Sequence, residues 1–222
     1  MTRISVLATV ALVLLGCSSS KQAEGQQPPA SAQAPASQAQ APPPAAITND
    51  KAPDTFRVNM ELSTGPVILE ITRADAPIGA DRFYNLVKAK FFDGARFFRV
   101  VPGFVVQFGL AANPAMSQAW SVPIQDDPVK QTNARGALVF AATSQPNSRT
   151  EQLFINLVDN ARLDQAGFAP FGKVVSGMEA VDKITSQYGE QPDQQAITTQ
   201  GNAYLEQAFP KLDFIKTATI AK

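Results

Sequence analysis

Apolar and polar residues alternate most regularly in two neighbouring segments of the chain. Residues 56–62 and 67–71 each carry an apolar side chain at every second position, and Ser63-Thr64-Gly65-Pro66 separates the two segments. Alternation with a period of two is typical of strands with one buried face, and a short turn-forming sequence between two such runs predicts a hairpin. We therefore expect the folded part of the chain to begin with two antiparallel strands.

The pattern changes to helical spacing after the hairpin. Ala76-Pro77 is followed by Phe83, Leu86 and Val87, which recur at i, i+3 and i+4. Proline is favoured at the first position of a helix because its missing N–H would have no partner there. The spacing predicts an amphipathic helix that buries this apolar face.

The most apolar stretch of the chain covers residues 91–109. Two turn signals, Asp93-Gly94 and Pro102-Gly103, divide it into short apolar segments. Strand geometry would place Phe97 and Arg99 on one face and Phe98 and Val100 on the other. An arginine that shares a face with aromatic residues could serve an apolar pocket with a few fixed donors, or could only cap the edge of a core.

Shorter elements are expected in the rest of the chain. Residues 109–131 have weak periodicity and are interpreted as a long loop with room for one short strand, and Asp126-Asp127 as part of that loop rather than as an acid/base pair. Ser176-Gly177-Met178-Glu179 fits a capping box at the start of a helix. Further strands are expected at 135–141, 152–157, 171–175 and 212–220, and a short helix at 201–209. Many short strands with only two clear helices favour an antiparallel barrel or sandwich.

Composition excludes several kinds of chemistry within this chain. The 222 residues contain one cysteine and no histidine, so a His/Cys zinc site, a Ser-His-Asp or Cys-His nucleophilic pair and an intrachain disulfide cannot be built. Lys plus Arg and Asp plus Glu both number 19, so no overall charge favours nucleic acid as a partner. We expect neither a metal nor a cofactor.

The first 17 residues have the form of a secretory signal. Arg3 precedes an apolar run that is too short to span a bilayer, and Leu14-Leu15-Gly16-Cys17 ends it. This ending resembles the bacterial lipobox, in which cleavage leaves the cysteine as a lipidated N-terminus, although an ordinary signal peptide would also explain the run. We expect residues 1–16 to be a lipoprotein signal peptide and Cys17 to carry the lipid. More than one acyl chain would give a stable membrane anchor.

Residues 17–53 are expected to form a disordered tether. They consist mainly of Ala, Gln, Pro and Ser and have almost no large apolar side chain, so they cannot offset the entropy cost of ordering. The prolines favour an extended chain that would hold the following domain tens of ångströms from the membrane. A proline-rich ligand for another domain is the alternative, but the sequence has no repeated spacing.

A family resemblance is carried by residues 97–107. Phe-Phe-Arg-Val-Val-Pro-Gly-Phe-Val-Val-Gln resembles the cyclophilin signature, usually Phe-His-Arg-Val-Ile-Pro-Gly-Phe-Met-x-Gln. The resemblance implies that residues 54–222 form a closed eight-stranded antiparallel β-barrel capped by two α-helices, and so a mainly β fold. It also implies a peptidyl-prolyl cis-trans isomerase (rotamase) that acts on proline-containing, unfolded or extended polypeptides.

The resemblance also implies roles for individual residues. Arg99 matches the catalytic arginine, and Gln107 matches the glutamine that binds the substrate or orients that arginine. A pocket for the substrate is implied at Phe104, Val105, Ala141, Ala142, Gln152, Phe154, Leu163 and Phe168. Without the resemblance, Phe104 and Phe154 would be interpreted as core and Gln107 as an exposed strand residue.

The sequence departs from the family pattern at several positions. Phe98 replaces the signature histidine and Val105 a methionine, while Phe108 replaces a glycine and leaves the course of the next loop open. Phe168 occupies the position of a frequent pocket histidine. Arg162 falls where cyclosporin-sensitive members tend to have tryptophan, which predicts weak binding of cyclosporin.

Two functions of different classes fit these observations. The first is a monomeric isomerase that accelerates the folding of cell-envelope proteins, anchored through Cys17 to a membrane, with Ser18 favouring the outer membrane and a periplasmic domain. The second is a non-catalytic module that binds proline-containing peptides as a chaperone or assembly factor. An intact Arg99 and Gln107 favour the enzyme, because a binder has no need of a donor at the prolyl nitrogen.

Overall fold

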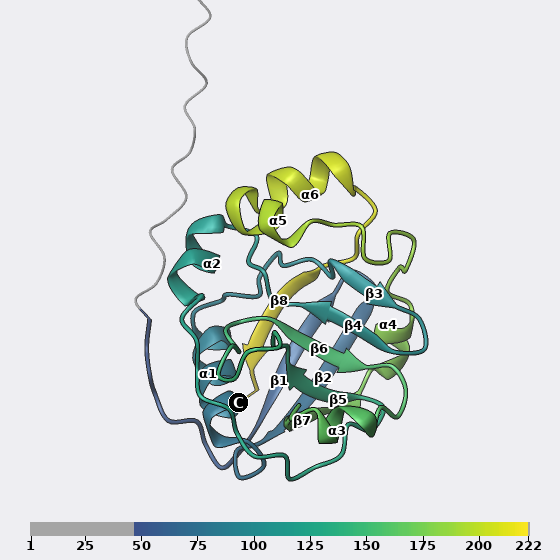
Figure 1. Cartoon of the computed structure of the whole chain (residues 1–222). Coiled ribbons are helices and arrows are strands. Elements are labelled where there is room, and N and C mark those ends of the chain that lie inside the picture. The colour runs from purple at the N-terminus through teal and green to yellow at the C-terminus, as the bar shows by residue number, and fades with distance from the viewer. Residues whose placement is uncertain (1–46, 222) are drawn as a thin grey trace, which may run out of the picture. The chain divides into compact units, whose positions relative to one another are not determined.

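The computed structural model describes residues 47–221, which form one eight-stranded sheet and six helices (Figure 1). The strands are β1 (Thr55–Leu62), β2 (Gly65–Thr72), β3 (Arg99–Val101), β4 (Val105–Phe108), β5 (Ala137–Phe140), β6 (Leu153–Asn156), β7 (Pro170–Ser176) and β8 (Ile215–Ile220). The helices are α1 (Pro77–Lys88), α2 (Pro114–Trp120), α3 (Arg162–Gln165), α4 (Met178–Asp182), α5 (Gln194–Gln200) and α6 (Asn202–Ala208). The predicted signal peptide, Cys17 and most of the predicted tether lie outside the described residues.

All strand pairs of the sheet are antiparallel, in the order β3-β4-β6-β5-β7-β2-β1-β8. The edge strands β3 and β8 share no ladder, but an isolated bridge between Arg96 and Phe214 joins the segments that precede them. Next to this bridge, Phe97 N–H donates to the Asp213 carbonyl at 3.0 Å. The predicted mainly β, eight-stranded antiparallel architecture is confirmed. The predicted closure into a barrel is not confirmed, because β3 and β8 form no ladder and only the segments before them and the start of β8 exchange a few backbone hydrogen bonds.

The first hairpin follows from the alternation in its sequence. Residues of β1 are alternately exposed and buried along its whole length. Leu62 pairs with Gly65, so the turn contains only Ser63 and Thr64, and the Gly-Pro pair belongs to β2 rather than to the turn that we expected. Gly65 has a φ of 138°, which residues with a side chain rarely adopt.

The main core lies on the inner side of the curled sheet and is rich in aromatic rings. Phe83 of α1 packs against Phe92 and Phe171 with ring centroids 5.6 and 5.4 Å apart. Phe108 of β4 packs against Phe92 from the other side at 5.7 Å. Tilted and edge-on rings at these separations stabilise the core beyond their buried area. The predicted apolar face of α1 therefore covers the sheet, as expected.

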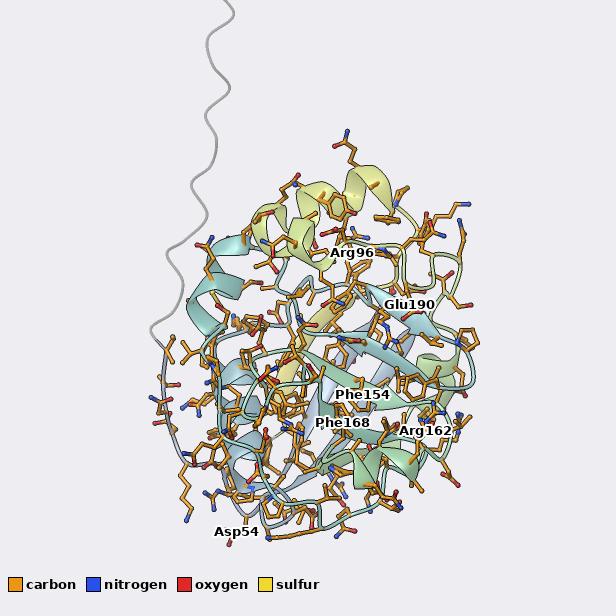
Figure 2. All side chains as sticks on the ribbon, in the orientation of Figure 1. Asp54, Arg96, Phe154, Arg162, Phe168 and Glu190 are labelled. Atoms are coloured by element: carbon orange, nitrogen blue, oxygen red, sulfur yellow. The ribbon has the colours of Figure 1, made fainter. Side chains whose placement is uncertain are left out.

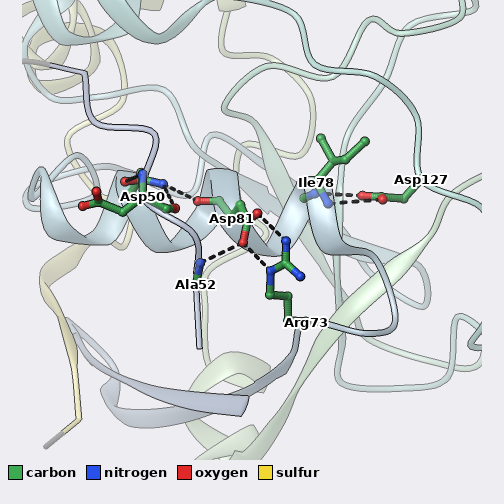
Figure 3. A network of polar contacts seen from close by, with 8 residues as sticks. Asp50, Ala52, Arg73, Ile78, Asp81 and Asp127 are labelled. Atoms are coloured by element: carbon green, nitrogen blue, oxygen red, sulfur yellow. Dashed lines mark hydrogen bonds and ion pairs between the residues drawn. The ribbon is translucent and has the colours of Figure 1, made fainter. Parts of the chain in front are cut away.

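A loop carboxylate caps the N-terminus of α1. Pro77 occupies the first helical position, and Asp127 accepts hydrogen bonds from Ile78 N–H at 3.2 Å and Gly79 N–H at 2.8 Å (Figure 3). A carboxylate at this position satisfies free N–H groups and interacts favourably with the helix dipole. Asp127 thus has a structural partner, in agreement with its interpretation as a loop residue.

Asp81 of α1 holds the chain that leads into the domain. Its Oδ1 accepts from Ala52 N–H at 2.8 Å and from Arg73 Nε at 2.7 Å, as Figure 3 shows. Burial acts to raise the pKa of Asp81, but these hydrogen bonds and the Arg73 charge outweigh it and hold that pKa below its ordinary value. The end of the predicted tether is therefore fixed to the fold at residue 52.

The region expected to be a long loop contains a helix that the periodicity did not indicate. The Asn113 side chain accepts from Ala115 N–H at 3.0 Å, and Pro114 takes the first helical position of α2. Asn followed by Pro is a helix start signal in its own right. The rest of the region contains only an isolated bridge between Ile124 and Arg149.

The predicted capping box at residues 176–179 is wrong. Ser176 is the last residue of β7 and lies one position before the N-cap of α4. Gly177 takes the cap position with a φ of 85° and makes no side-chain hydrogen bond, and α4 has only five residues. The prediction of two helices also underestimates the helical content, because α2, α3 and α5 lie in segments without clear periodicity.

A second, smaller core joins β3 to the segment before β8. We call residues 188–209 the C-terminal insertion; it contains α5 and α6, which lie side by side at one end of the molecule (Figure 1). The small core, here the Phe98 cluster, contains Phe98, Leu110, Ile197, Leu205 and Leu212. Among residues 47–221, no helix is both long enough and apolar enough to cross a membrane.

Candidate active site

The candidate site begins with a row of residues on the outer face of the sheet. Arg99 of β3 pairs directly with Gln107 of β4, which pairs with Phe154 of β6, and Phe154 pairs with Val139 of β5. Directly opposed residues on neighbouring strands point to the same face. The sheet therefore brings a guanidinium, an amide and an aromatic ring side by side.

The sequence pattern assigned the sides of residues 97–100 incorrectly. Phe97 and Val100 are both buried in the main core, whereas Phe98 belongs to the Phe98 cluster and Arg99 points to the outer face. The alternation fails because β3 begins only at Arg99, so the preceding residues are not in regular strand conformation. Arg99 thus lies on the side opposite to Phe97.

A cavity of about 400 Å³ opens on this face. We call it the outer-face cavity. It is lined by Arg99, Phe104, Val105, Gln107, Ala141, Ala142, Thr143, Ser148, Thr150, Gln152, Phe154, Leu163, Phe168 and Gln194. Every residue predicted to contact the substrate is in this set. The structure therefore brings the predicted residues together, while their catalytic and binding roles remain predictions.

The apolar part of the cavity is separate from the main core. Val105, Ala137, Val139 and Phe154 form its buried base, and Phe104, Ala141, Leu163 and Phe168 pack against that base. Phe154 and Phe168 meet edge to face with centroids 5.7 Å apart (Figure 2). A small apolar group, such as a pyrrolidine ring, is the kind of ligand that such walls accept.

The polar part of the cavity is a chain of side-chain hydrogen bonds. Arg99 Nη1 donates to Gln107 Oε1 at 3.3 Å, and Gln107 Nε2 donates to Gln152 Oε1 at 2.9 Å. Arg99 Nε also donates to Glu190 Oε1 at 2.6 Å. Gln107 is only 8% exposed, so its side chain is confined between its two partners. The guanidinium is therefore held beside the apolar walls.

Buried asparagines support the cavity from below. Asn160 Nδ2 donates to the Phe104 carbonyl at 3.0 Å, and Asn133 Nδ2 donates to the Phe168 carbonyl at 2.9 Å. Asn156 links the two, because it donates to Asn133 Oδ1 and its own Oδ1 accepts from Asn160. The walls are thus fixed through their backbones.

Asp164 ties α3 to this asparagine group. It accepts from Asn133 Nδ2 at 2.7 Å and from Thr132 Oγ1 at 2.7 Å. Burial acts to raise the pKa of Asp164, but the hydrogen bonds from Asn133 and Thr132 hold it below its ordinary value. Leu163, the neighbouring residue in α3, is placed at the cavity in this way.

Two arginines lie against the aromatic walls. The Arg162 guanidinium is 4.8 Å from the Phe104 ring centroid, and that of Arg149 is 5.8 Å from the Phe168 ring centroid. Both distances are in the range of cation–π contacts. Burial lowers the pKa of Arg149, which also donates to Asp126 and to the Gly167 carbonyl.

Sequence reasoning missed four residues of the cavity and the carboxylate partner of Arg99. Thr143, Ser148 and Thr150 belong to the polar loop between β5 and β6, and Gln194 comes from α5. Glu190, which binds Arg99, is 91 residues away along the chain. No local pattern indicates a contact of that separation. Within residues 47–221, no group of three or more His, Cys, Asp or Glu side chains could hold a metal.

Comparison with known proteins identifies the family. The sequence model of the family described as cyclophilin type peptidyl-prolyl cis-trans isomerase/CLD matches residues 57–202, which is more than half of the chain. The chain belongs to the cyclophilin-type peptidyl-prolyl cis-trans isomerases. The family match includes Arg99 and every residue of the outer-face cavity.

Bacterial cyclophilins are among the similar curated proteins. A peptidyl-prolyl cis-trans isomerase of Acinetobacter baylyi is 40% identical over 141 residues, which are 60% of this chain and 75% of that protein. Peptidyl-prolyl cis-trans isomerase B of Escherichia coli is 31% identical over 175 residues, covering 74% of this chain and 99% of that protein.

Solved cyclophilins share the fold at lower identity. A Cryptosporidium parvum cyclophilin, solved in the presence of the dipeptide Ala-Pro, is 19% identical with a TM-score of 0.57 and covers 75% of this chain and 99% of that chain. A cyclophilin from Hirschia baltica is 16% identical with a TM-score of 0.57 and covers 77% of this chain and 75% of that chain.

Two departures from the cyclophilin signature have structural explanations. Phe98, in place of the signature histidine, is fully buried in the Phe98 cluster, where it contacts the C-terminal insertion rather than the cavity. Phe108, in place of a glycine, continues β4 opposite Leu153 and points into the main core. Neither change alters the row formed by Arg99, Gln107 and Phe154.

Proposed function

We propose that this cyclophilin-type isomerase binds a proline ring in the outer-face cavity and stabilises the twisted Xaa-Pro amide through Arg99. The observation that carries the proposal is the row Arg99–Gln107–Phe154 on three neighbouring strands. It sets a fixed, charged donor at the edge of an apolar pocket. No other cavity residue combines a permanent charge with a restrained position.

The chemistry of isomerisation requires little more than such a donor. The barrier to rotation is about 18–20 kcal/mol and comes from amide resonance, while the cis and trans forms differ by only about 0.5–1 kcal/mol. A catalyst must bind the twisted amide more tightly than either planar form. Twisting localises the lone pair on the prolyl nitrogen, which then accepts a hydrogen bond better than the planar amide does. A guanidinium N–H directed at that nitrogen would therefore stabilise the twisted state more than either planar form.

Each group of residues has a part in this mechanism. Phe154, Phe168 and Leu163 hold the proline ring, and Gln107 keeps the guanidinium in place. The substrate backbone would pair with the end of β5. There, Ala141 N–H already donates to the Gln152 carbonyl at 2.9 Å, so the substrate would use the Ala141 carbonyl and the peptide groups of Ala142.

The cellular setting that we propose rests on the sequence. A lipid on Cys17 would anchor the chain, and residues 17–53 would hold the domain away from the membrane. Ser18 supports an outer-membrane location with the domain in the periplasm. The substrates would then be unfolded or extended envelope proteins, and the protein would act as a monomer.

Exchange NMR on an Ala-Pro peptide tests the proposed mechanism. We expect the full chain to accelerate cis/trans exchange at catalytic concentration, and Arg99→Ala to reduce the acceleration by about 100-fold or more while the variant stays folded. An Arg99→Ala variant with wild-type activity would contradict the assigned role. Peptide binding without any acceleration by the wild-type chain would instead indicate the alternative, a non-catalytic proline-binding module.

A further inference from the structure

The C-terminal insertion packs against the rest of the fold and reaches the candidate active site. Ile197 of α5 and Leu205 of α6 are buried with Phe98 in the Phe98 cluster. Phe209 packs edge-on against Tyr188 and Tyr204, with centroids 5.2 and 5.7 Å away. The two ends of the insertion are therefore held together and against the strand that carries Arg99.

The insertion covers the free edge of β3 at the position next to Arg99. Val100 N–H donates to the Gly189 carbonyl at 3.0 Å, and Gly189 N–H donates to the Ser186 carbonyl at 3.0 Å. Gly189 has a φ of 53°, which a residue without a side chain adopts at no steric cost. Glu190 follows directly, so its backbone is fixed relative to β3.

We propose that Glu190 is a positioning residue that holds the Arg99 guanidinium in its productive orientation. Its Oε1 accepts from Arg99 Nε at 2.6 Å, while Gln107 Oε1 accepts from Nη1 at 3.3 Å. These two bonds fix two of the three guanidinium nitrogens. Within residues 47–221, Nη2 makes no hydrogen bond, so its two N–H groups and the second N–H of Nη1 are left for a substrate.

The physical reason is the flexibility of arginine. Its long side chain has several rotatable bonds, and a guanidinium that must be ordered during each turnover contributes less to rate than one that is held beforehand. Gln107 alone fixes a single point, and the guanidinium could still rotate about it. A second bond on Nε, from a different element, removes that rotation.

Glu190 is suited to orienting rather than to stabilising the fold. Its side chain is 60% exposed and that of Arg99 is 26% exposed, so the ion pair contributes little to stability in water. The C-terminal insertion also supplies a carboxylate that is equally exposed and does not touch the cavity: Glu206, 61% exposed, accepts from Nη2 of Arg96, which is 11% exposed, at 3.1 Å. Because Arg96 is more buried than Arg99, removing Glu206 should cost at least as much stability as removing Glu190, and only the loss of Glu190 should affect the rate.

The test compares Glu190→Ala, Glu190→Gln and the control Glu206→Ala in the full chain. The inference rests on the role proposed for Arg99, so Arg99→Ala is measured in the same experiment. We expect Glu190→Ala to lower kcat/KM for an Ala-Pro peptide on the order of tenfold. Glu190→Gln should stay within about threefold of wild type, because its amide oxygen still accepts from Nε. Glu206→Ala should keep the wild-type kcat/KM, and Glu190→Ala should melt at a temperature no lower than that of Glu206→Ala.

The NMR signal of the Arg99 Nε–H, assigned by its loss in Arg99→Ala, gives a second measurement. It should shift in Glu190→Ala and stay unchanged in Glu206→Ala. Unchanged or raised kcat/KM in Glu190→Ala, or an equal loss in Glu190→Ala and Glu206→Ala, would overturn the inference. If Arg99→Ala is inactive while Glu190→Ala keeps wild-type activity, only the Glu190 inference fails. If Arg99→Ala is fully active, the proposed mechanism fails as well.

Discussion

Arg99 and Gln107 lie directly opposite each other on neighbouring antiparallel strands, and Arg99 Nη1 donates to Gln107 Oε1 at 3.3 Å. Their register places the catalytic candidate and its partner without help from any loop. Sites carried by strands are held more firmly than sites on loops. The position of Arg99 is therefore a property of the sheet, while Glu190 adds a contact from outside it. Substitutions that keep the sheet intact can test both.

Arg99→Lys should separate the contribution of the positive charge to catalysis from that of the guanidinium geometry. A lysine ammonium keeps the positive charge but lacks the planar fork, so it cannot hold Gln107 and donate to a substrate in the same fixed arrangement. We expect kcat/KM for an Ala-Pro peptide to fall at least about tenfold while peptide affinity, measured by NMR titration, changes less than about threefold. Retention of full activity would mean that charge alone is sufficient.

Gln152→Ala should have a smaller effect than Gln107→Ala. Gln107 contacts Arg99 directly, whereas Gln152, which also lines the cavity, reaches Arg99 only through the hydrogen bond that it accepts from Gln107 at 2.9 Å. A hydrogen bond contributes about 0.5–1.5 kcal/mol, so we expect about a tenfold loss in kcat/KM for Gln107→Ala and about a threefold loss for Gln152→Ala. Gln118→Ala, on the exposed side of α2, is the control and should have no effect. An effect of Gln152→Ala larger than that of Gln107→Ala would contradict the chain of contacts.

Asn133→Ala should weaken both stability and substrate binding. Asn133 is fully buried and bonds to Asp164, Asn156 and the Phe168 carbonyl. Leaving such partners unsatisfied costs about 1–3 kcal/mol in the free energy of unfolding, which urea denaturation would measure. KM should also rise because Phe168 loses its backbone support.

The control for this substitution is Asn59→Ala, at an exposed position of β1, which should change the free energy of unfolding by less than about 0.5 kcal/mol. Loss of stability in Asn133→Ala with an unchanged KM would show that the asparagine group supports the fold but not the cavity.

Glu151→Gln should stabilise the protein near neutral pH. Glu151 is only 3% exposed, one of its oxygens has no partner, and burial raises the pKa of its carboxyl above the ordinary 4.5. At pH values between 4.5 and the raised pKa, the Glu151 carboxyl keeps its proton in the folded state but has released it in the unfolded state. The free energy of unfolding therefore falls as pH rises through this window. The Glu151→Gln side chain does not titrate, so the variant does not lose stability in this window.

Thermal unfolding from pH 4 to pH 8 is the measurement for Glu151. The difference in Tm between Glu151→Gln and wild type should grow as pH rises through that window and then level off. Equal pH profiles for the two proteins would show that the carboxyl has the same pKa in the folded and unfolded states.

The sequence predicts best those elements that one local rule determines. Residues 56–62 form β1 because alternation matches the pleat, and Pro77 begins α1 because its backbone angle suits a helix start. The rule that serine caps helices gave a wrong prediction at Ser176, which is the last residue of β7. At Phe98 it failed because tertiary contacts with Ile197 determine which side the ring takes.

In the candidate site too, some residues can be predicted from the sequence and others are brought in only by the fold. Arg99, Gln107 and Phe104 belong to one signature, so the resemblance names them together, and the β3–β4 register brings the first two into contact. Glu190 and Gln194 come from an insertion whose sequence carries no motif, and only packing against Phe98 brings them to the cavity. Asn133 and Asn160 would be taken for loop residues and Asn156 for the end of a strand, because the burial of all three follows from the fold and not from their type.

The outer-face cavity lies on the side of the sheet opposite to its aromatic core. In the proposed function, a polypeptide would therefore lie across β5 and β6 with both of its ends running away from the enzyme, without threading through an opening and without any loosening of the fold. The length of a client chain would then place no limit on its use as a substrate. A proline in the middle of a long extended segment is as accessible as one in a short peptide, provided that the client itself leaves that segment free.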